Sequence, residues 1–428
     1  MIKKMYGVKE RKYIIQTLAE IKKTVMGAGL QINWVVVTYT WLQFVAWGFL
    51  SILIAEVVRD SYHAACHHVK WLGKWHNKHH MVYRRDLSII SLEAYRDSQL
   101  YHDIVESILL LVIISAIAII FHPVGLWLGV VYAGTFLYGA SLRYFLGKVE
   151  TDYTHKPGAL EVIPSVWWVN RSYHWRHHFD DVNAYYSGVF PIVDKVLGTA
   201  LSFKGKTVAL TGASGSLGQA MTAKLLKNNA KVVALTTHPE KFVEQPRFTV
   251  IPWELGKEEE LRSRLQKVDI LIINHGINVY GSRTSEDIDK SFEVNTFSAV
   301  RLMDVFFSTV TGADAKATKE IWINTSEAEV SPALSPLYEL SKRTLGNIIT
   351  LKRLQSPCTI RKLILGPFKS ELNPYGVMSA EQVAAGIVFL ARRDFRNIIV
   401  TVNPLTYIFF PIKELSTWLY YRIFSVAK

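Results

Sequence analysis

Residues 63–80 read HAACHHVKWLGKWHNKHH, and residues 174–178 read HWRHH. Residues three and four apart on an α-helix share one face. In helical form each box therefore presents its histidines together: His63 with His67, His76 with His79 and His80, and His174 with His177 and His178. Neutral imidazole is a common ligand of iron, copper, nickel and zinc, so three such boxes in one part of the chain predict a metal site.

Long apolar runs separate the histidine boxes. Residues 34–58 carry one charge, Glu56, and as a helix they would extend about 37 Å, enough to cross a bilayer. Residues 107–142 contain no Asp, Glu, Lys or Arg, and His122-Pro123 lies at their middle. We expect a helical hairpin that enters or crosses the membrane, with two buried helices of a soluble domain as the alternative. Such a hairpin lets all the boxes meet at one membrane face.

Two carboxylates lie on the same helical stripe as the first box. Glu56, Asp60, His63 and His67 are spaced i, i+4, i+7 and i+11, so the acids could orient the imidazoles. The alternative is that Glu56 pairs with a nearby Lys or Arg.

The sequence HAACHH, then HNKHH, then DYTH and HWRHHFDDVNAYYSGVFPIVDKVLGT resembles the fatty acid hydroxylase and sterol desaturase superfamily of membrane enzymes over residues 34–200. The resemblance implies two iron ions that activate O2 to hydroxylate or desaturate a lipid, with electrons from an unidentified donor. The ligands that it implies are His63, His67, His76, His79, His80, His155, His174, His177 and His178. Members often carry a further histidine after the second box; residues 93–97 lack one, and His102 is a candidate substitute. His68 and His122 are expected to lie outside the site.

A different pattern begins near residue 203, where short apolar strands alternate with amphipathic helices. Residues 206–210 are strand-like, residues 211–218 read TGASGSLG and open a helix through about Lys227, and residues 231–235 form a second strand. Glycines in such a turn let the backbone approach a pyrophosphate at a helix N-terminus. The pattern predicts a dinucleotide-binding β-α-β unit.

The positions that follow resemble the short-chain dehydrogenase/reductase family over residues 203–400. These positions are Asn274-His275-Gly276, Asn295, Ser326, Tyr338-x-x-x-Lys342 and Gly366-Pro367. The resemblance implies Tyr338 as the general acid/base, Lys342 as the cation that lowers its pKa and holds the nicotinamide ribose, Ser326 for the carbonyl, and Asn295 for a proton relay. The implied cofactor-binding residues are Thr211, Gly212, Ser214, Gly215, Leu217, Gly218, Thr236, Asn274, Gly276, Lys342, Gly366 and Pro367.

Three departures from that family's usual pattern matter. Ser216 stands where a glycine is usual, His275 replaces an alanine and is expected to pack locally, and Thr325 rivals Ser326 because the serine lies one position closer to Tyr338 than usual. The second strand ends in Thr236-Thr237-His238, with no acid to bind a ribose hydroxyl, which favours NADP(H) over NAD(H).

Charge and composition fit a membrane enzyme. The formal net charge is +13; without a nucleic-acid motif, we attribute it to an anionic membrane surface and expect no nucleic-acid partner. Residues 1–33 are basic and helix-patterned without an apolar core, so we expect an amphipathic segment and no cleavable signal peptide. Residues 401–428 are rich in aromatic side chains, and we interpret them as a membrane-facing tail, with ordinary core packing as the alternative.

These observations predict an N-terminal all-α integral membrane histidine-box domain and a C-terminal α/β Rossmann-like domain with a doubly wound parallel sheet. The functional hypothesis is a bifunctional oxidoreductase of a membrane lipid, in which O2-dependent diiron chemistry is coupled to NAD(P)(H)-dependent alcohol/carbonyl interconversion. Two alternatives stay open: the dehydrogenase-like half makes an aldehyde that the metal half consumes, or it binds nucleotide without catalysis. We expect the histidine cluster and the dehydrogenase-like domain on the cytosolic face.

Overall fold

The computed structural model describes residues 34–312 and 314–426 together with residue 16. The expected N-terminal amphipathic segment therefore lies outside the described residues, apart from residue 16. The chain divides into two compact units, one comprising Met1–Ala55 and Leu110–Thr135, the other Glu56–Leu109 and Phe136–Lys428. The second unit holds all of the predicted site residues.

The first half of the chain is helical. Its helices are α2 (Trp34–His68), α3 (Lys70–His80), α4 (Leu92–Ser98), α5 (Ile104–Phe121), α6 (Trp127–Leu146), α7 (Arg171–Phe179) and α8 (Ile192–Leu197), with the π-helical turn η2 (Gln99–Asp103) and the 3₁₀ turns η3 (Val124–Leu126) and η4 (Val149–Thr151). Among the described residues, three helical stretches are long and apolar enough to cross a membrane: Thr38–His68, Leu92–Phe121 and Val124–Leu146. The hairpin turns at His122 and Pro123, as predicted, and His122 adopts a positive φ of 67°.

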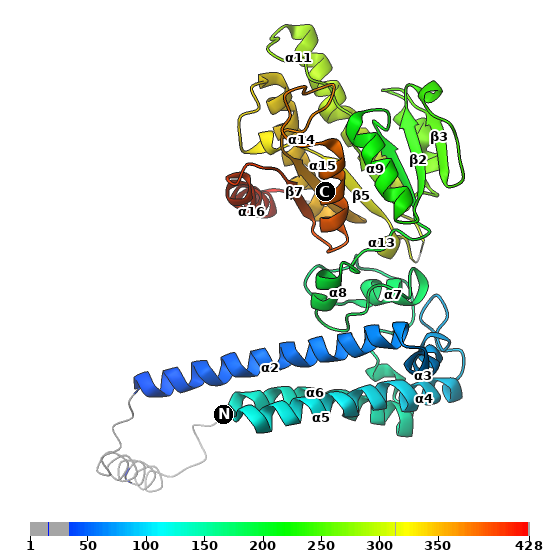
Figure 1. The fold of residues 1–428 in the computed structure, drawn as a ribbon, viewed down its shortest axis with the longest axis vertical. Helices are drawn as coiled ribbons and strands as arrows, with labels where there is room; N and C mark the ends of the chain where they lie inside the picture. Colours follow the sequence, from blue (N-terminus) through cyan, green and yellow to red (C-terminus); the bar gives the residue numbers. More distant parts are fainter. Residues whose placement is uncertain (1–15, 17–33, 313, 427–428) are drawn as a thin grey trace, which may run out of the picture. The chain divides into compact units, whose positions relative to one another are not determined.

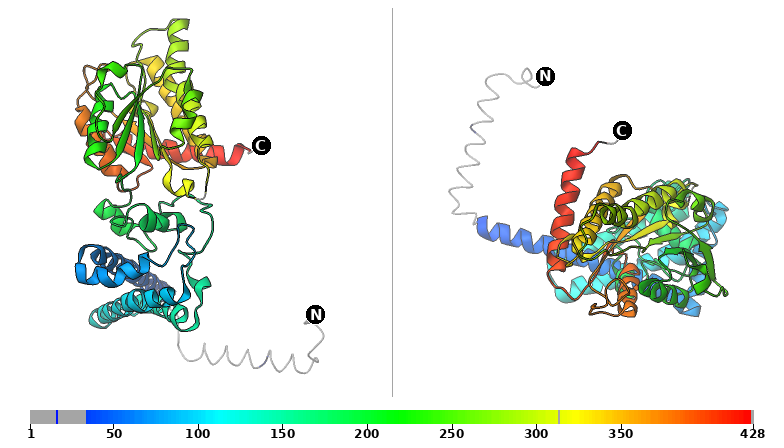
Figure 2. Two further views of the ribbon diagram at one scale, coloured as in Figure 1. Left: turned by 90° about the vertical axis from the view of Figure 1, so that its right-hand side faces the viewer. Right: turned by 90° about the horizontal axis from the view of Figure 1, so that it is seen from above.

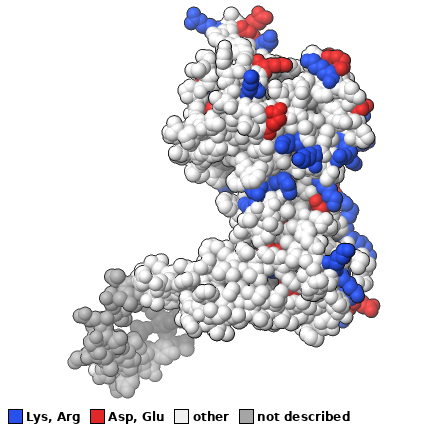
Figure 3. All heavy atoms as spheres, viewed as in Figure 1, with Lys and Arg blue, Asp and Glu red and all other residues white. Residues whose placement is uncertain are grey.

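In residues 34–55 and 110–135, which the structure describes, the first unit is helical and carries no charged side chain. These ranges contain no Asp, Glu, Lys or Arg, and the described part of the unit is white in Figure 3. Small residues let α2 and α6 approach closely here. A Cβ at Gly129 would lie 2.7 Å from the Ser51 side chain, and one at Gly125 would lie 2.4 Å from the carbonyl oxygen of Phe44. Small residues at helix crossings are typical of membrane helices.

The second half of the chain alternates strands and helices. The strands are β1 (Thr207–Thr211), β2 (Lys231–Thr236), β3 (Phe248–Pro252), β4 (Ile270–Ile273), β5 (Glu320–Asn324), β6 (Thr359–Leu365) and β7 (Asn397–Val400). The helices are α9 (Ser216–Lys227), α10 (Arg262–Leu265), α11 (Ser285–Phe292), α12 (Ser298–Ser308), α13 (Ala315–Thr318), α14 (Pro336–Lys352), α15 (Ala380–Ala391) and α16 (Thr406–Phe424), with the π-helical turn η7 (Glu293–Phe297) and the 3₁₀ turns η5 (Pro239–Lys241), η6 (Glu258–Leu261), η8 (Glu327–Glu329) and η9 (Arg353–Gln355).

The strands form one parallel sheet in the order β3-β2-β1-β4-β5-β6-β7. Because successive strand residues point to opposite faces, the sheet has two cores. Val208 and Leu210 pack with α9 and α15, whereas Ala209 packs on the other face with α12 and α14. Helices thus cover both faces of the sheet (Figure 1). The predicted doubly wound parallel sheet is confirmed.

The helix that carries the third histidine box is attached to the amino-terminal edge of this sheet. Arg176 of α7 is buried, and its guanidinium lies 3.0 Å from a carboxylate oxygen of Glu320, the first residue of β5. Arg361 of β6 binds the same carboxylate at 2.7 Å. Lys206, just before β1, lies 2.6 Å from Asp180, just after α7. The catalytic residues predicted for the sheet domain follow the carboxyl ends of β4 and β5, so the two centres lie at opposite edges of one sheet.

Candidate functional site: a histidine cluster and a dinucleotide cleft

The histidine boxes converge in the second unit. Among the described residues, the possible metal ligands form two main groups. One group is His63, His67, His76, His80 and His177; the other is His79, His155, His174 and His178. Helices α2, α3 and α7 supply eight of these side chains, which confirms the helical reading of the three boxes. His155 comes from the loop after η4.

The ring nitrogens of the second group cannot satisfy one another by hydrogen bonding. The Nε2 atoms of His155, His174 and His178 lie 2.9, 3.0 and 3.2 Å apart in pairs. A hydrogen bond needs one protonated and one bare nitrogen, and among three mutually contacting atoms at least two are alike. A cation bound by three bare nitrogens removes the conflict. These residues therefore fit a metal ion.

The nitrogen spacing can also be compared with that around a bound ion. Imidazole nitrogens bound at about 2.1 Å lie about 3.0 Å apart when two ligands meet at a right angle, and about 3.4 Å apart in a tetrahedron. The other group shows equally short spacings, with 2.7 Å between Nε2 of His67 and His76 and 3.0 Å between Nε2 of His63 and His177. In both groups, neighbouring imidazole nitrogens are therefore close enough to bind one ion.

Burial keeps the rings neutral and able to act as ligands. Desolvation, with neighbouring imidazoles, holds the pKa of His79, His174 and His178 well below the usual histidine range. Burial lowers the pKa of His177 to about 4, against the Ala184 carbonyl, which raises it. Neutral imidazole is the form that binds metals.

Hydrogen bonds from the far side of two rings fix their tautomers. Nδ1 of His155 donates to Asp152 at 2.8 Å, and Nδ1 of His177 donates to the Ala184 carbonyl at 2.7 Å. Each Nε2 is then bare and faces the cluster. Tyr83 and Tyr95 donate their hydroxyls to Asp152 at 3.0 and 3.1 Å. The sequence analysis missed Asp152, although it stands three positions before His155 in DYTH.

The structure also places three residues near the cluster whose roles were uncertain from the sequence. His102, on η2, lies with its Nδ1 3.2 Å from that of His76, and it forms a third possible ligand group with His79 and Asp103. Glu56 forms an ion pair with Arg59 at 2.7 Å, which favours the pairing alternative over an orienting role. His68 contacts Tyr186 at 3.2 Å and lies outside the ligand groups.

The glycine-rich turn lies between β1 and α9, as predicted. Gly212 has a φ of 63°, and a Cβ at Gly218 would lie 2.1 Å from the Gly212 carbonyl oxygen. The N-cap of α9 is Gly215, which offers no capping side chain. The first amides of α9 are therefore open to an anion. Ser214 and Leu217 belong to the same turn, and Leu217 is buried in the core beneath it.

Thr211 and Asn274 connect this turn to the neighbouring strand β4. The Thr211 hydroxyl accepts the Asn274 amide at 2.9 Å and lies 2.9 Å from Nδ1 of His275, whose Nε2 contacts Ser298 at 2.7 Å. His275 therefore packs locally, as expected. At the end of β2, the Thr236 hydroxyl accepts the His238 amide at 3.0 Å.

The predicted catalytic residues meet at the carboxyl edge of the sheet. The Ser326 side chain acts on the Tyr338 phenol and opposes the rise in the Tyr338 pKa that burial causes. The rival Thr325 instead donates to the Leu363 carbonyl at 3.1 Å. Lys342 lies one turn after Tyr338, with its Nζ 5.9 Å from the phenol ring centroid. Burial lowers the pKa of Lys342 to about 8, and Glu329 acts in the opposite direction.

Asn295 and Lys342 have little room around them. Asn295 lies on the π-helical turn η7, accepts the Ile277 amide at 2.8 Å and donates to the Ile277 carbonyl at 3.0 Å. Lys342 donates to the Asn324 carbonyl at 3.1 Å. A Cβ at Gly276 would lie 2.9 Å from Asn295 Oδ1 and 3.6 Å from Lys342 Nζ, so only glycine fits. Gly366, with Pro367 after it, closes the cleft at the end of β6, where a Cβ would meet Thr401 at 2.2 Å.

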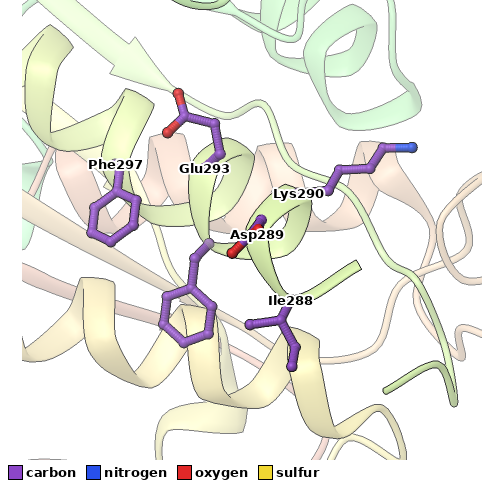
Figure 4. Close-up of a pocket in the computed structure, with 6 residues that line it drawn as sticks. Ile288, Asp289, Lys290, Glu293 and Phe297 are labelled. Carbon is purple, nitrogen blue, oxygen red and sulfur yellow. The ribbon is translucent and has the colours of Figure 1, made fainter. Parts of the chain in front are cut away.

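The cleft has features that fit a nicotinamide dinucleotide. The glycine turn leaves the first amides of α9 open to a phosphate. The Lys342 ammonium donates one hydrogen bond, to the Asn324 carbonyl, and has further hydrogens to donate. Asn324 donates its amide to Asn274 at 2.9 Å, while its Oδ1 is buried without a hydrogen-bond partner in the described part of the chain. A shallow hollow of about 560 Å³ on the outer side of α11 and η7, lined by Ile288, Phe292 and Phe297, contains none of the predicted site residues (Figure 4).

Comparisons with known proteins find one relative over most of the chain and several over its second half. The short chain dehydrogenase family matches residues 206–355. The monoglucosyldiacylglycerol epimerase of Synechocystis is 48% identical over 408 residues, which cover 90% of this chain and 98% of that protein. The 3-oxoacyl-[acyl-carrier-protein] reductase of Rickettsia conorii is 32% identical over 106 residues, 22% of this chain and 44% of that protein. A short chain dehydrogenase from Burkholderia cenocepacia, solved with NADP, aligns with a TM-score of 0.44 at 17% identity over 53% of this chain and 100% of that one.

Proposed function

This chain belongs to the family of the Synechocystis monoglucosyldiacylglycerol epimerase, and from that premise we propose that it inverts one hydroxyl-bearing ring carbon in the sugar headgroup of a monoglucosyl diacylglycerol. The chain is a membrane-associated oxidoreductase with a short-chain dehydrogenase domain. Inversion at a carbinol carbon fits this chemistry because oxidation to a ketone removes the stereocentre, and reduction on the other face restores it inverted.

The observation that carries the proposal is the grouping of Ser326 with Tyr338 and of Lys342, whose Nζ lies 5.9 Å from the Tyr338 ring centroid. The glycine turn and Lys342 would hold a nicotinamide dinucleotide, which would supply reversible hydride transfer at the ring carbon. Tyr338 takes the hydroxyl proton as the ketone forms and gives it back as the alcohol reforms. The Lys342 ammonium favours the phenolate, and Ser326 holds the substrate oxygen beside the phenol. The carbon loses and regains one hydride, so the reaction is redox-neutral.

The loops around the cleft suit a lipid. Leu334, in the loop after β5, is 94% exposed, and Tyr375 and Val377, in the loop after β6, are 92% and 67% exposed. Large apolar side chains gathered in the open mark surfaces that bind lipid or protein. Leu334 follows β5, as Tyr338 does, and Tyr375 and Val377 follow the neighbouring strand β6. Acyl chains would have apolar contacts on the same side of the sheet as the reacting headgroup. The absence of an acid at the end of β2 supports NADP(H) over NAD(H).

The test uses the purified full-length protein in lipid nanodiscs with monoglucosyl diacylglycerol and NADP+. Hydrolysis of the recovered lipid releases its sugar, which is identified by chromatography. We expect a second hexose from the wild-type protein and only glucose from Tyr338→Phe. Glucose as the sole sugar from the wild-type protein, with either nicotinamide cofactor, would refute the proposal.

The histidine cluster supports a second activity, and we propose that it holds two iron ions. The two main ligand groups and the close nitrogen spacing support this assignment. Bound irons, with O2 and electrons from a separate donor, would supply oxidation of a lipid C–H bond, as hydroxylation or desaturation. The chain itself presents bare Nε2 atoms to the ions. Asp152 accepts a hydrogen bond from Nδ1 of His155, and the Ala184 carbonyl accepts one from Nδ1 of His177, so the Nε2 atom of each ring stays bare.

Elemental analysis of protein expressed with ample iron tests the second proposal independently of turnover. We expect close to two iron ions per chain in the wild-type protein, and fewer in His79→Ala and in His177→Ala, with nucleotide binding intact in both. Lipid extracts from cells that carry the wild-type or the His79→Ala chain identify the oxidised lipid and the order of the two reactions. The absence of stoichiometric metal would refute the diiron proposal. We also infer a cytosolic location for both centres, since the dehydrogenase cleft needs cellular nicotinamide dinucleotide.

A further inference from the structure

Helix α16 projects an apolar surface that the sheet domain does not cover. The helix follows β7, at the edge of the sheet opposite β3, and extends outward from it (Figures 1 and 2). Only its inner side packs inward, through Thr406, Phe410 and Glu414. On its outer side Ile412, Leu415 and Ile423 are 61%, 58% and 69% exposed. A soluble domain rarely exposes so continuous an apolar face.

A second apolar segment lies across a hollow from the base of α16. The loop of residues 162–168 carries Trp167 and Trp168, which are 72% and 58% exposed. The hollow between them has a volume of about 700 Å³ and is lined by Trp168 on one side and by Leu415 and Trp418 on the other. The outer side of α16, the hollow and the loop of residues 162–168 form one surface, which we name the aromatic face.

Arg422, which lies over the Trp418 ring, is an exposed cation of α16. In the hollow, Arg396 is paired with Asp394 at 3.1 Å, and an exposed acid, Glu161, precedes the loop of residues 162–168. Glu414 is the one acid in residues 401–428, and it is buried against Lys362 at 2.7 Å and Arg353 at 3.0 Å. Arg353 and Arg396 line the hollow, and within the described residues the buried Nε of Arg396 has no hydrogen-bond partner. The visible surface around α16 is almost entirely white in Figure 3. Tryptophan and arginine beside exposed aliphatic side chains are the composition of surfaces seated in lipid headgroups.

Helix α16 is also tied to the loop that carries Ser326. Glu327, the next residue, accepts the hydroxyl of Thr401 at 2.6 Å and that of Thr406, the first residue of α16, at 3.2 Å. Lys413 of α16 lies 2.7 Å from Glu329 in the same turn. Short, partly buried contacts therefore connect α16 to the turn that follows Ser326 in the dehydrogenase cleft.

We propose that the aromatic face is a membrane-docking surface, seated in the headgroup layer of an anionic bilayer, and that it holds the dehydrogenase cleft beside the lipid surface. The occupant is the bilayer and not a second copy of the chain, because the face combines cations and tryptophans with aliphatic side chains and exposes no acid on α16 to pair with another copy's arginines. The docking is independent of which reaction the cleft performs.

Spin labels on single introduced cysteines test the docking directly. Both native cysteines, Cys66 and Cys358, are buried, so the wild-type chain should take up no label. The probe positions are Leu419→Cys on α16 and Trp167→Cys in the loop, both exposed, so the substitutions leave the core intact. The matched control is Val243→Cys, 85% exposed in the segment between β2 and β3, at the other edge of the sheet.

The full-length protein is reconstituted into vesicles of phosphatidylcholine and phosphatidylglycerol, and collisions of each label with O2 and with a water-soluble nickel chelate are measured. We expect the labels at 419 and 167 to collide several-fold more with O2 than with nickel, relative to the label at 243. An equal ratio at all three positions would overturn the proposal. Labels at 419 that are shielded from both reagents and broadened by one another would indicate a second copy of the chain and would equally overturn it. None of these readouts depends on turnover, so failure here leaves the proposed epimerase activity standing.

Discussion

The histidine cluster and the dehydrogenase cleft differ in what holds their reactive side chains in position. In the cleft, the predicted catalytic side chains contact other protein groups: Ser326 acts on Tyr338, and Asn295 accepts the backbone amide of Ile277. In the cluster, bare nitrogens face one another at about hydrogen-bond distance with no proton arrangement that satisfies them all. The catalytic side chains of the cleft are therefore positioned by protein contacts, whereas the spacing of the cluster nitrogens fits a bound ion.

The two centres also lie at opposite ends of the strands of one sheet. The third histidine box attaches at the amino end of β5, and Ser326 follows its carboxyl end. A five-residue strand extends about 16 Å at about 3.3 Å per residue. A lipid that is a substrate of both proposed reactions would therefore have to leave one centre before it reaches the other.

The largest expected effect separates the cleft from the cluster. Tyr338→Phe removes the proton-transferring hydroxyl and should lower kcat/KM for sugar inversion by about 10²- to 10⁴-fold, with NADP(H) affinity and metal content unchanged. Steady-state kinetics and nucleotide titration measure this. Tyr138→Phe, which removes a hydroxyl from a side chain of α6 that is 67% exposed, is the matched control and should leave both values unchanged. Full turnover in Tyr338→Phe would remove the cleft from the mechanism.

The next effect tests whether the two regions fold as one body. Glu320→Gln leaves Arg176 and Arg361 buried without their shared carboxylate. Breaking such a buried pair should lower the free energy of unfolding by about 3–5 kcal/mol, measured by denaturant titration in detergent. Asp304→Asn disrupts an exposed pair with Lys352 and should cost less than about 1 kcal/mol. Similar losses in the two variants would show that the attachment of α7 to the sheet contributes little.

A smaller effect sharpens the account of the cluster. Asp152→Asn keeps every histidine but weakens the acceptor that fixes the His155 tautomer. Metal affinity should fall by about 10- to 100-fold, measured by competition with a chelator, while nucleotide affinity stays the same. His68→Ala is the control, because His68 lies beside His67 but contacts Tyr186. Unchanged metal affinity in Asp152→Asn would contradict the role given to this carboxylate.

The smallest effect is a pH dependence in the cleft. Burial lowers the pKa of Lys342 to about 8 from its usual value of 10.5, so the folded, cofactor-free protein loses this charge as the pH rises through about 8. Hydrogen bonds from a charged donor contribute about 1.5–3 kcal/mol, so NADP(H) affinity should fall by about 10-fold or more above that pKa. Lys342→Met should bind weakly at every pH without this step. An affinity that rises across the same range would contradict the assignment.

Much of both centres follows from local spacing in the sequence. The helical period predicted the faces of the three boxes, and the strand-glycine-helix order predicted the turn at Gly212 and the doubly wound sheet. The spans were also predicted, although α2 continues as one helix beyond residue 58 to His68 and so carries the first box itself. The site roles of Tyr338, Lys342, Ser326 and Asn295 stay predictions that await kinetic tests.

The rest depends on pairs that are distant in the chain. His63 meets His177 across 114 positions, and Arg176 meets Glu320 across 144, which no periodicity encodes. His102 could be suspected but not assigned, because its π-helical turn shifts the helical register. Asp152 was hidden because a single carboxylate near a histidine is common. Whether Ser326 or Thr325 faces Tyr338 depends on how the chain leaves β5.

Isotope retention under anaerobic conditions tests the central claim most directly. The full-length protein is incubated without O2 with a catalytic amount of NADP+ and monoglucosyl diacylglycerol that carries deuterium on every ring carbon of the sugar. Mass spectrometry and sugar analysis then follow the lipid. We predict an epimeric hexosyl lipid of unchanged mass with all its deuterium, because the hydride that leaves the ring carbon returns to it. Unchanged glucose, or an epimeric lipid that has lost one deuterium atom, would contradict the account.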